Sequence, residues 1–212
     1  MTAHVDVFVD YVCPFCFLIE PAIEELQRDR DVEVRIRPFE LRPDPVPTLR
    51  PEDEYLPQVW NDSVYPMSRR VGVPMTLPTI SPQPRTEKAF MVLQLAEEHG
   101  RAEQYTKAMF SAFFQQDRDI GEDHVILEVA TSVGLDAAEV TEALSSPERR
   151  EKHRAEQSRA LGLIGSHVVP VVVIEGQVLR GVPSARRLKK VVDEFSGNPR
   201  PAEQGTTVRG RT

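Results

Sequence analysis

The sequence predicts an α/β protein in which two short α/β units are separated by a helical insertion. Three observations support this fold class. Apolar residues follow a strand-helix-strand order near the start of the 212-residue chain, a helical period through most of its middle, and a strand-strand-helix order near its end. A chain of this length is sufficient for one substantial domain that carries an insertion.

The first unit is predicted from two strand patterns on either side of a helical one. Residues 4–9 are rich in Val and Phe, and a helical spacing of apolar residues begins after Cys13-Pro14 and continues to Leu26. In residues 32–36, Val and Ile alternate with Glu and Arg, which indicates a strand with one apolar face. The order is therefore β-α-β.

The middle of the chain is predicted to be helical after a proline-rich stretch. Eleven of the 18 prolines lie between Pro38 and Pro84, where long regular elements are disfavoured and one short helix is expected around residues 55–71. From residue 85 to 163 the apolar spacing is helical almost throughout. Ser146 is placed to cap a charged helix that begins at the proline after it.

The last unit is predicted from two short strands and a helix. Residues 169–174 and 177–180 have strand character with a Glu-Gly turn between them, and Ser184 begins a helix. The whole order divides the chain into an α/β domain of residues 1–48 and 165–196, a helical insertion of residues 49–164 that we expect to cover the functional site as a lid, and a disordered tail of residues 197–212.

Composition and charge exclude several functional classes. The chain has 26 Lys and Arg against 33 Asp and Glu, a net charge of −7, so it lacks the basic surface that nucleic acid or an anionic membrane requires. Its longest apolar run, residues 168–174 broken by Pro170, is far shorter than a membrane span. The N-terminus has no basic segment followed by an apolar one, so we expect a cytoplasmic protein without nucleic-acid or membrane partners.

The two cysteines of the chain, Cys13 and Cys16, carry the strongest functional signal. They stand where the first strand gives way to the first helix, the context in which a C-x-x-C pair acts as a redox dithiol. Together with the element order, this placement predicts a thioredoxin fold. As the N-cap, Cys13 would lie exposed beside unpaired amides at the positive helix end, which favours the thiolate, while Pro14 fixes the first turn. Cys16, one turn on and deeper, would resolve the mixed disulfide that Cys13 forms.

Three other interpretations of the cysteine pair remain open at this point. The cysteines could be half of a zinc site, although the chain has no second C-x-x-C and its five histidines show no ligand spacing. They could be buried inert thiols. They could also be remnants in a thioredoxin-fold binding protein that no longer performs redox chemistry.

Four sequence motifs resemble those of a known family. They are Asp10-Tyr11-Val12-Cys13-Pro14-Phe15-Cys16, Arg37-Pro38-Phe39-Glu40-Leu41, Phe113-Phe114 followed by Asp119-Ile120, and Val169-Pro170 with Gly181 after it. On these motifs, residues 4–195 resemble the DsbA-like branch of the thioredoxin superfamily, especially its cytoplasmic FrnE-like and 2-hydroxychromene-2-carboxylate isomerase-like members. The resemblance implies a thiol-disulfide oxidoreductase whose Cys13-Cys16 dithiol acts on a disulfide or thiol substrate, either a protein or a small molecule.

The resemblance also implies which residues meet the substrate. The proline at the position of Pro170 is cis in this family and packs beside the dithiol, and the residue before it, Val169, offers main-chain groups to the substrate. Pro14 and Phe15 complete the expected substrate-binding set. An X-Pro bond adopts the cis form at a cost of only about 0.5 to 1 kcal/mol, whereas composition alone would make Pro170 a trans proline at a sheet edge.

Two departures from the family pattern bear on function. Val168 and Val171 stand where relatives often carry Gly and Thr, which makes the rim of the groove bulkier and less polar. Isomerase relatives usually carry Ser at the position of Cys13 and use bound glutathione, so the two cysteines favour thiol-disulfide chemistry. A glutathione-dependent isomerase or transferase and a non-catalytic binding module are the alternatives. Glutathione is a candidate co-substrate, and no metal or other cofactor is expected.

Asp10 and His167 are candidates for a proton relay to the dithiol. Asp10, three residues before Cys13, could be a buried carboxylate that takes the proton of Cys16, or a solvated Asp at a strand end. His167, three residues before Pro170, could approach Cys13 and stabilise its thiolate, or be a loop histidine with no role.

Overall fold

A computed structural model describes residues 2–165 and 167–197 of the chain. Most of the predicted tail at residues 197–212 lies outside the described residues, so its disorder stays a prediction. In the described part of the chain, no helix is both long and apolar enough to cross a membrane.

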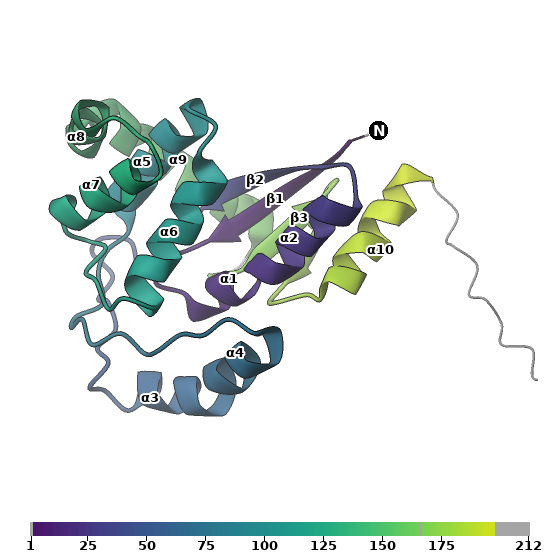
Figure 1. The fold of residues 1–212 in the computed structure, drawn as a ribbon, viewed down its shortest axis with the longest axis horizontal. Coiled ribbons are helices and arrows are strands. Elements are labelled where there is room, and N and C mark those ends of the chain that lie inside the picture. Colours follow the sequence, from purple (N-terminus) through teal and green to yellow (C-terminus); the bar gives the residue numbers. More distant parts are fainter. Residues whose placement is uncertain (1, 166, 198–212) are drawn as a thin grey trace, which may run out of the picture.

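Four strands form one mixed sheet in the order β2-β1-β3-β4 (Figure 1). The strands are β1 (Ala3–Val9), β2 (Val32–Pro38), β3 (Val171–Ile174) and β4 (Gln177–Arg180). The central strand β1 pairs in parallel with β2 and antiparallel with β3, so that Val7 lies opposite both Ile36 and Val172. The two predicted units thus share one sheet, and the predicted α/β class with thioredoxin topology is confirmed.

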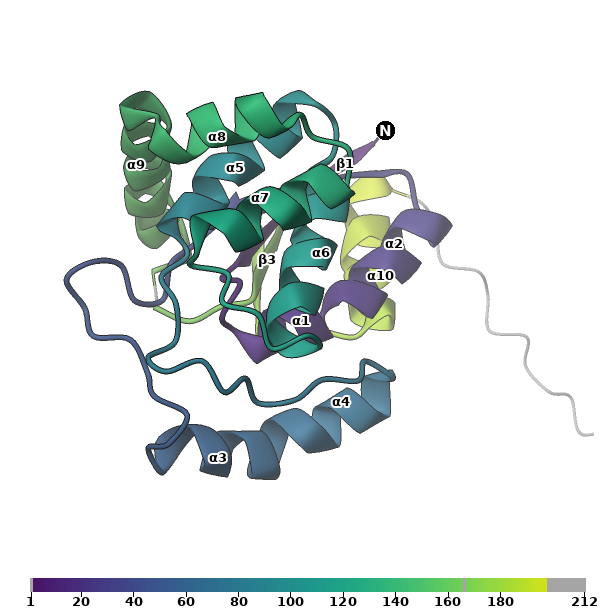
Figure 2. The same ribbon diagram turned by 60° about the vertical axis from the view of Figure 1, so that its left-hand side comes forward.

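Helices that belong to the two α/β units cover one face of the sheet. They are α1 (Pro14–Leu18), α2 (Glu20–Asp29) and α10 (Ala185–Ser196). Helices α2 and α10 lie side by side, and they contact β2 and β1 respectively (Figure 2). The single helix predicted after Cys13 is divided at Ile19, because Pro21 in the first turn of α2 lacks the amide hydrogen that a continuous helix would use.

The segment between the two units is helical, as predicted. Its elements are α3 (Tyr55–Val59), the π-helical turn η1 (Trp60–Val64), α4 (Tyr65–Val71), α5 (Glu87–Glu98), α6 (Ala102–Phe114), α7 (Asp123–Ser132), α8 (Ala137–Ser145) and α9 (Pro147–Ile164). The first three form one continuous stretch where a single short helix was expected. The predicted cap of α9 is confirmed, since the Ser146 hydroxyl accepts a hydrogen bond from the Arg149 amide at 3.2 Å. Helix α9 contacts β2 from the face opposite α2 and α10 (Figure 2).

The inserted helices and the sheet share one hydrophobic core. Tyr11, just after β1, stacks on Phe90 of α5 with ring centroids 4.6 Å apart. Phe17 of α1 stacks on Phe110 of α6 with centroids 5.4 Å apart. Aromatic rings from the insertion therefore anchor the segment that contains both cysteines.

Candidate active site

The dithiol lies at the junction of β1 and α1. Cys13 is the N-cap of α1, and Pro14 is its first residue. The Cys13 amide donates to the Asp10 carbonyl and the Cys16 amide to the Cys13 carbonyl, each at 3.0 Å, and these two turns carry the chain from strand to helix. Both cysteines are free thiols, so the structure shows the reduced dithiol.

The expectation that Cys13 is exposed at the helix tip is wrong. Its exposed fraction is 5%, and that of Cys16 is 0%. The Cys13 side chain makes no capping hydrogen bond with the amides of α1. Its thiol instead donates to the Val169 carbonyl oxygen, with the sulfur and the oxygen 3.4 Å apart. The sulfur is shielded from solvent because it turns toward this loop rather than outward.

The Val169-Pro170 loop lies beside the dithiol because β3, which follows the loop, pairs with β1, which precedes Cys13. The peptide bond between the two residues is cis, and the Pro170 carbonyl accepts a hydrogen bond from the Gly181 amide at 3.0 Å. Val171 then begins β3 opposite Phe8 near the end of β1. Segments that are 156 residues apart in the sequence are thereby brought together at Cys13.

Cys16 has a less favourable environment for ionisation than a free cysteine. Burial raises the pKa of the Cys16 thiol well above its ordinary value, and the hydrogen bond with Cys13 and the charges of Cys13 and Asp10 raise it further. A thiol that stays protonated is a poor nucleophile. Cys13 is therefore the better candidate for the first attack on a substrate.

Asp10 is a buried carboxylate, which excludes the solvated alternative. Its exposed fraction is 1%. The Leu41 amide donates to Oδ2 at 2.7 Å, and the Thr86 hydroxyl donates to Oδ1 at 2.8 Å. Burial raises the pKa of Asp10 to about 6, although these hydrogen bonds act to lower it. A carboxyl with such a pKa can both accept and release a proton near neutral pH.

His167 lies at the surface. Its ring is tilted against Phe39 with centroids 6.4 Å apart. Among residues 2–165 and 167–197, no hydrogen bond joins it to either cysteine. The role of His167 in a proton relay therefore stays a prediction.

Two buried groups near Asp10 were not predicted from the sequence. Glu40, just after β2, and His153, on α9, lie with Oε1 and Nε2 2.7 Å apart. They are 113 residues apart in the chain, so no local pattern could pair them. The one sequence feature that pointed to Glu40 was its position in the Arg37-Pro38-Phe39-Glu40-Leu41 motif, which resembles a motif of the family.

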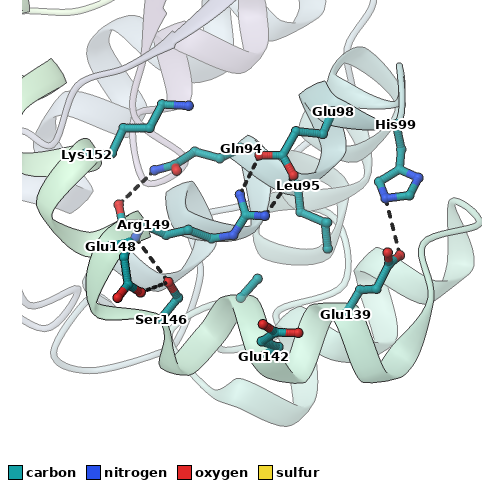
Figure 3. Close-up of a pocket in the computed structure, with 11 residues that line it drawn as sticks. Gln94, Leu95, Glu98, His99, Glu139, Glu142, Ser146, Glu148, Arg149 and Lys152 are labelled. Carbon is teal, nitrogen blue, oxygen red and sulfur yellow. Dashed lines mark hydrogen bonds and ion pairs between the residues drawn. The ribbon is translucent and has the colours of Figure 1, made fainter.

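Two hollows of the structure differ in their relation to the predicted site residues. A cavity of about 10 Å³, near the size of one water molecule, is lined by Asp10, Val12, Arg42, Thr48, Gln83, Pro84, Arg85 and Thr86. A pocket of about 420 Å³ lies between α5, α8 and α9 and is lined by the Arg149–Glu98 ion pair and by His99, which contacts Glu139 (Figure 3). No predicted site residue lines this pocket. Within the described ranges, no group of three or more His, Cys, Asp or Glu side chains could hold a metal ion.

A C-x-x-C dithiol at the strand-helix junction of a β-α-β unit is typical of thioredoxin-like proteins. Here a cis-proline loop lies beside it at the same end of the sheet. The comparison with known families agrees with this class. Residues 4–194 match the DSBA-like thioredoxin domain, and the chain belongs to that family.

Individual relatives cover nearly the whole chain. The chain is 36% identical over 195 residues to the uncharacterized protein YwbO of Bacillus subtilis (strain 168). The alignment covers 92% of this chain and 98% of YwbO. Its structure is similar to that of SCO1869 of Streptomyces coelicolor, described as a probable DsbA oxidoreductase, with a TM-score of 0.75, 24% identity and 95% and 93% of the two chains covered. It is also similar to the cytosolic disulfide reductase DsbM of Pseudomonas aeruginosa with GSH, with a TM-score of 0.65, 16% identity and 92% and 96% covered. These two structures share the fold.

Proposed function

We propose that this protein is a thiol-disulfide oxidoreductase in which Cys13 attacks and Cys16 resolves. The observation that carries the proposal is the contact of the Cys13 thiol with the Val169 carbonyl, with the fully buried Cys16 one helical turn away. Membership of the DSBA-like thioredoxin domain family supports the same conclusion.

The reaction consists of two successive thiol-disulfide exchanges. The Cys13 thiolate attacks one sulfur of a substrate disulfide, forms a mixed disulfide and releases the other sulfur as a thiolate. Cys16 then attacks the Cys13 sulfur, which breaks the mixed disulfide and releases the second substrate thiol. The substrate gains two electrons and two protons, and the protein is left with a Cys13–Cys16 disulfide. The same steps in reverse oxidise a dithiol substrate.

Asp10 is the proton acceptor for Cys16 in this scheme. Cys16 must lose its proton before it attacks, and because burial raises its pKa, it needs a base within the buried space. Asp10 is near enough for its charge to act on Cys16. Its own pKa of about 6 leaves Asp10 largely ionised at neutral pH. The water-sized cavity beside Asp10 offers a route by which the proton leaves.

The Val169 loop positions the substrate. In the reduced dithiol, the Val169 carbonyl is occupied by the Cys13 thiol. When Cys13 ionises, this oxygen becomes free to accept a hydrogen bond from a substrate amide, as in the addition of a strand to a sheet edge. Pro14 and Phe15, both half-buried, and Pro170 supply apolar contacts beside the reacting sulfur.

Glutathione disulfide and other small disulfides are the substrates that best fit a nearly buried nucleophile. A flexible small molecule reaches the sulfur of Cys13, a residue that is 5% exposed, more readily than does a disulfide held inside a folded protein. The likeness to a disulfide reductase solved with GSH is consistent with glutathione as co-substrate. A reducing compartment such as the cytoplasm would supply glutathione and keep the dithiol reduced.

Thiol counting tests this function directly. The chain has two cysteines, so glutathione disulfide should convert two free thiols per chain to none and release two glutathione thiols. Cys16→Ser should stop at a mixed disulfide between Cys13 and glutathione, and Cys13→Ser should form none. Intact mass spectrometry measures both, and a colorimetric thiol assay confirms the loss of protein thiols once the protein is separated from glutathione and denatured.

Three other outcomes would contradict the scheme. A mixed disulfide trapped on Cys16 would reverse the roles of the cysteines. Turnover of a glutathione-dependent substrate with no change in thiol number, retained in Cys16→Ser, would favour an isomerase or transferase. A reduced dithiol that reacts with no disulfide would leave a binding module.

A further inference from the structure

Two buried titratable side chains take no part in the steps above. The exposed fractions of the Glu40 and His153 side chains are 6% and 1%, and His153 Nε2 lies 2.7 Å from Glu40 Oε1. The imidazole also stacks on Phe90 with ring centroids 5.4 Å apart. Because burying two ionisable groups costs free energy, the pair points to a role beyond packing.

The pair is connected to Asp10 through the main chain. Gln157, one turn after His153 on α9, holds Glu40 on both sides: its Oε1 accepts from the Glu40 amide at 2.8 Å, and its Nε2 donates to the Glu40 carbonyl at 2.9 Å. The next amide, that of Leu41, donates to Asp10 Oδ2 at 2.7 Å. Helix α9 therefore fixes the segment that gives Asp10 its shortest hydrogen bond.

The charge of Glu40 acts on Asp10 as well. It raises the pKa of Asp10, in addition to the larger effect of burial. Among the described residues, the other charged or titratable groups near Asp10 are Arg42 and Arg85, which line the water-sized cavity, the thiol of Cys16 and the phenol of Tyr11. Arg85 is engaged with main-chain carbonyls. Glu40 is thus the acidic group that acts on Asp10 from this side.

The pair lies on the wall of a pocket of about 630 Å³. The other charged residues that line this pocket are Asp44, Arg85, Glu87, Lys88 and Arg154. Several of them already have partners, since Arg154 pairs with Glu87 at 3.2 Å and Lys88 pairs with Asp123 at 2.6 Å. The group in direct contact with the Glu40 carboxylate is His153.

We propose that Glu40 and His153 form a positioning pair for Asp10. Gln157 fixes the Glu40 main chain and so holds the Leu41 amide on the Asp10 carboxylate, while His153 fixes the Glu40 carboxylate and so sets the charge beside Asp10. These contacts determine how readily Asp10 takes the proton of Cys16. The proposal rests on the proposed function, because it assigns residues to the step in which Cys16 resolves the mixed disulfide. His153 acts through Glu40, and Glu40 acts through Asp10.

Two substitutions should move the titration of Asp10 in opposite directions. Glu40→Gln removes the negative charge but keeps a side chain that can bond to His153, so the pKa of Asp10 should fall by about half a unit or more. Gln157→Leu removes both bonds that fix the Glu40 main chain and weakens the Leu41 hydrogen bond, so the pKa of Asp10 should rise. NMR of the Asp10 carboxyl carbon against pH, in the reduced protein, measures both shifts.

The resolving step provides a second measurement. The rate at which Cys16 resolves a mixed disulfide between Cys13 and glutathione should have a pH midpoint that moves in the same direction as the Asp10 titration. The control is His99→Gln, which alters a pair of the same residue types, His99 and Glu139, 3.2 Å apart and 44% and 47% exposed (Figure 3). It should leave both measurements unchanged.

An Asp10 titration that is the same in the wild type and in both variants would overturn the proposal. A shifted titration with an unshifted resolving rate would overturn it too. Gln157 is half-buried at the helix surface, so Gln157→Leu keeps the test available where Glu40→Gln does not fold. The NMR titration needs no substrate. A wild-type protein that exchanges no disulfide would therefore overturn the proposed function by a separate measurement.

Discussion

Asp10 shows how burial changes the chemistry of a single carboxyl group. Its pKa is raised from 3.8 to about 6, chiefly because the group is desolvated. A carboxyl whose pKa is higher in the folded protein than in the unfolded chain binds its proton preferentially in the folded state. Its contribution to stability is therefore complete below the unfolded pKa of 3.8 and is lost as the pH rises through about 6.

Asp10→Asn should accordingly stabilise the protein at neutral pH. We expect the free energy of unfolding to rise by about 1 to 3 kcal/mol at about pH 7.5, because an amide does not ionise. Its oxygen can accept from the Leu41 amide, and its nitrogen can donate to the Thr86 hydroxyl oxygen. The gain should shrink toward about pH 4.5, where the wild-type carboxyl is protonated in the fold. Urea unfolding at both pH values measures this. Asp53→Asn, at an exposed position, should change neither value, and a loss of stability in Asp10→Asn at the higher pH would contradict the argument.

The dithiol could be predicted at the residue scale, but its surroundings could not. Two cysteines three residues apart at a strand-helix junction are a local pattern, visible in the sequence. The burial of Cys13 depends on Val169, and the burial of Asp10 depends on Leu41 and Thr86, all distant in the chain. Long-range contacts of this kind leave no periodic signal.

Helix α9 begins with a cap that can be tested alone. The Ser146 hydroxyl accepts from the Arg149 amide and donates to the Glu148 carboxylate. Ser146→Ala should lower the free energy of unfolding by about 1 kcal/mol, because amides at the helix start lose a partner. Ser158→Ala is the matched control, since that exposed hydroxyl only donates to the Arg154 carbonyl inside the same helix. Equal losses in both variants, measured by urea unfolding, would show that the cap is not the cause.

The kinds of element could be predicted more accurately than their ends. Alternation of apolar and charged residues was sufficient to predict β2 at residues 32–36. The strand nevertheless continues to Pro38, which pairs with β1. Strand β3 begins at Val171 and not at residue 169, because Pro170 has no amide hydrogen and the Val169 carbonyl bonds to Cys13. In both cases a neighbour in space, which the local pattern does not contain, determines where the strand ends.

At the scale of the whole molecule, the insertion is part of the core that supports the dithiol. Phe110 of α6 is 0% exposed and packs against Phe17 and Tyr11, which flank the two cysteines. The sheet and the insertion should therefore unfold as one cooperative unit.

A single substitution in the insertion should destabilise the insertion and the sheet by the same amount. Phe110→Ala should cost about 3 to 5 kcal/mol, since it leaves a large cavity between the two parts. Trp60, the one tryptophan of the chain, reports on the insertion by fluorescence, and the amide NMR signals of Val7 and Val172 report on the sheet. Both transitions should shift together. Phe195→Ala, at a 47% exposed position of α10, is the control and should have little effect.

Separate transitions for Trp60 and for the sheet would contradict this expectation. They would show that the inserted helices form an independent unit, as a movable lid would require.

The contact between Cys13 and Val169 also has a consequence for the order of events during synthesis. Both cysteines are synthesised before the helical insertion, whereas the carbonyl partner of Cys13 and strand β3, which pairs with β1, are synthesised after it. At about 5 to 20 residues per second, the interval between Cys16 and Ile174 lasts roughly 10 to 30 s. Throughout that time the nascent chain carries two thiols, and Cys13 lacks the loop that it contacts in the folded protein. We therefore expect the two thiols of the nascent chain to remain free only in reducing surroundings.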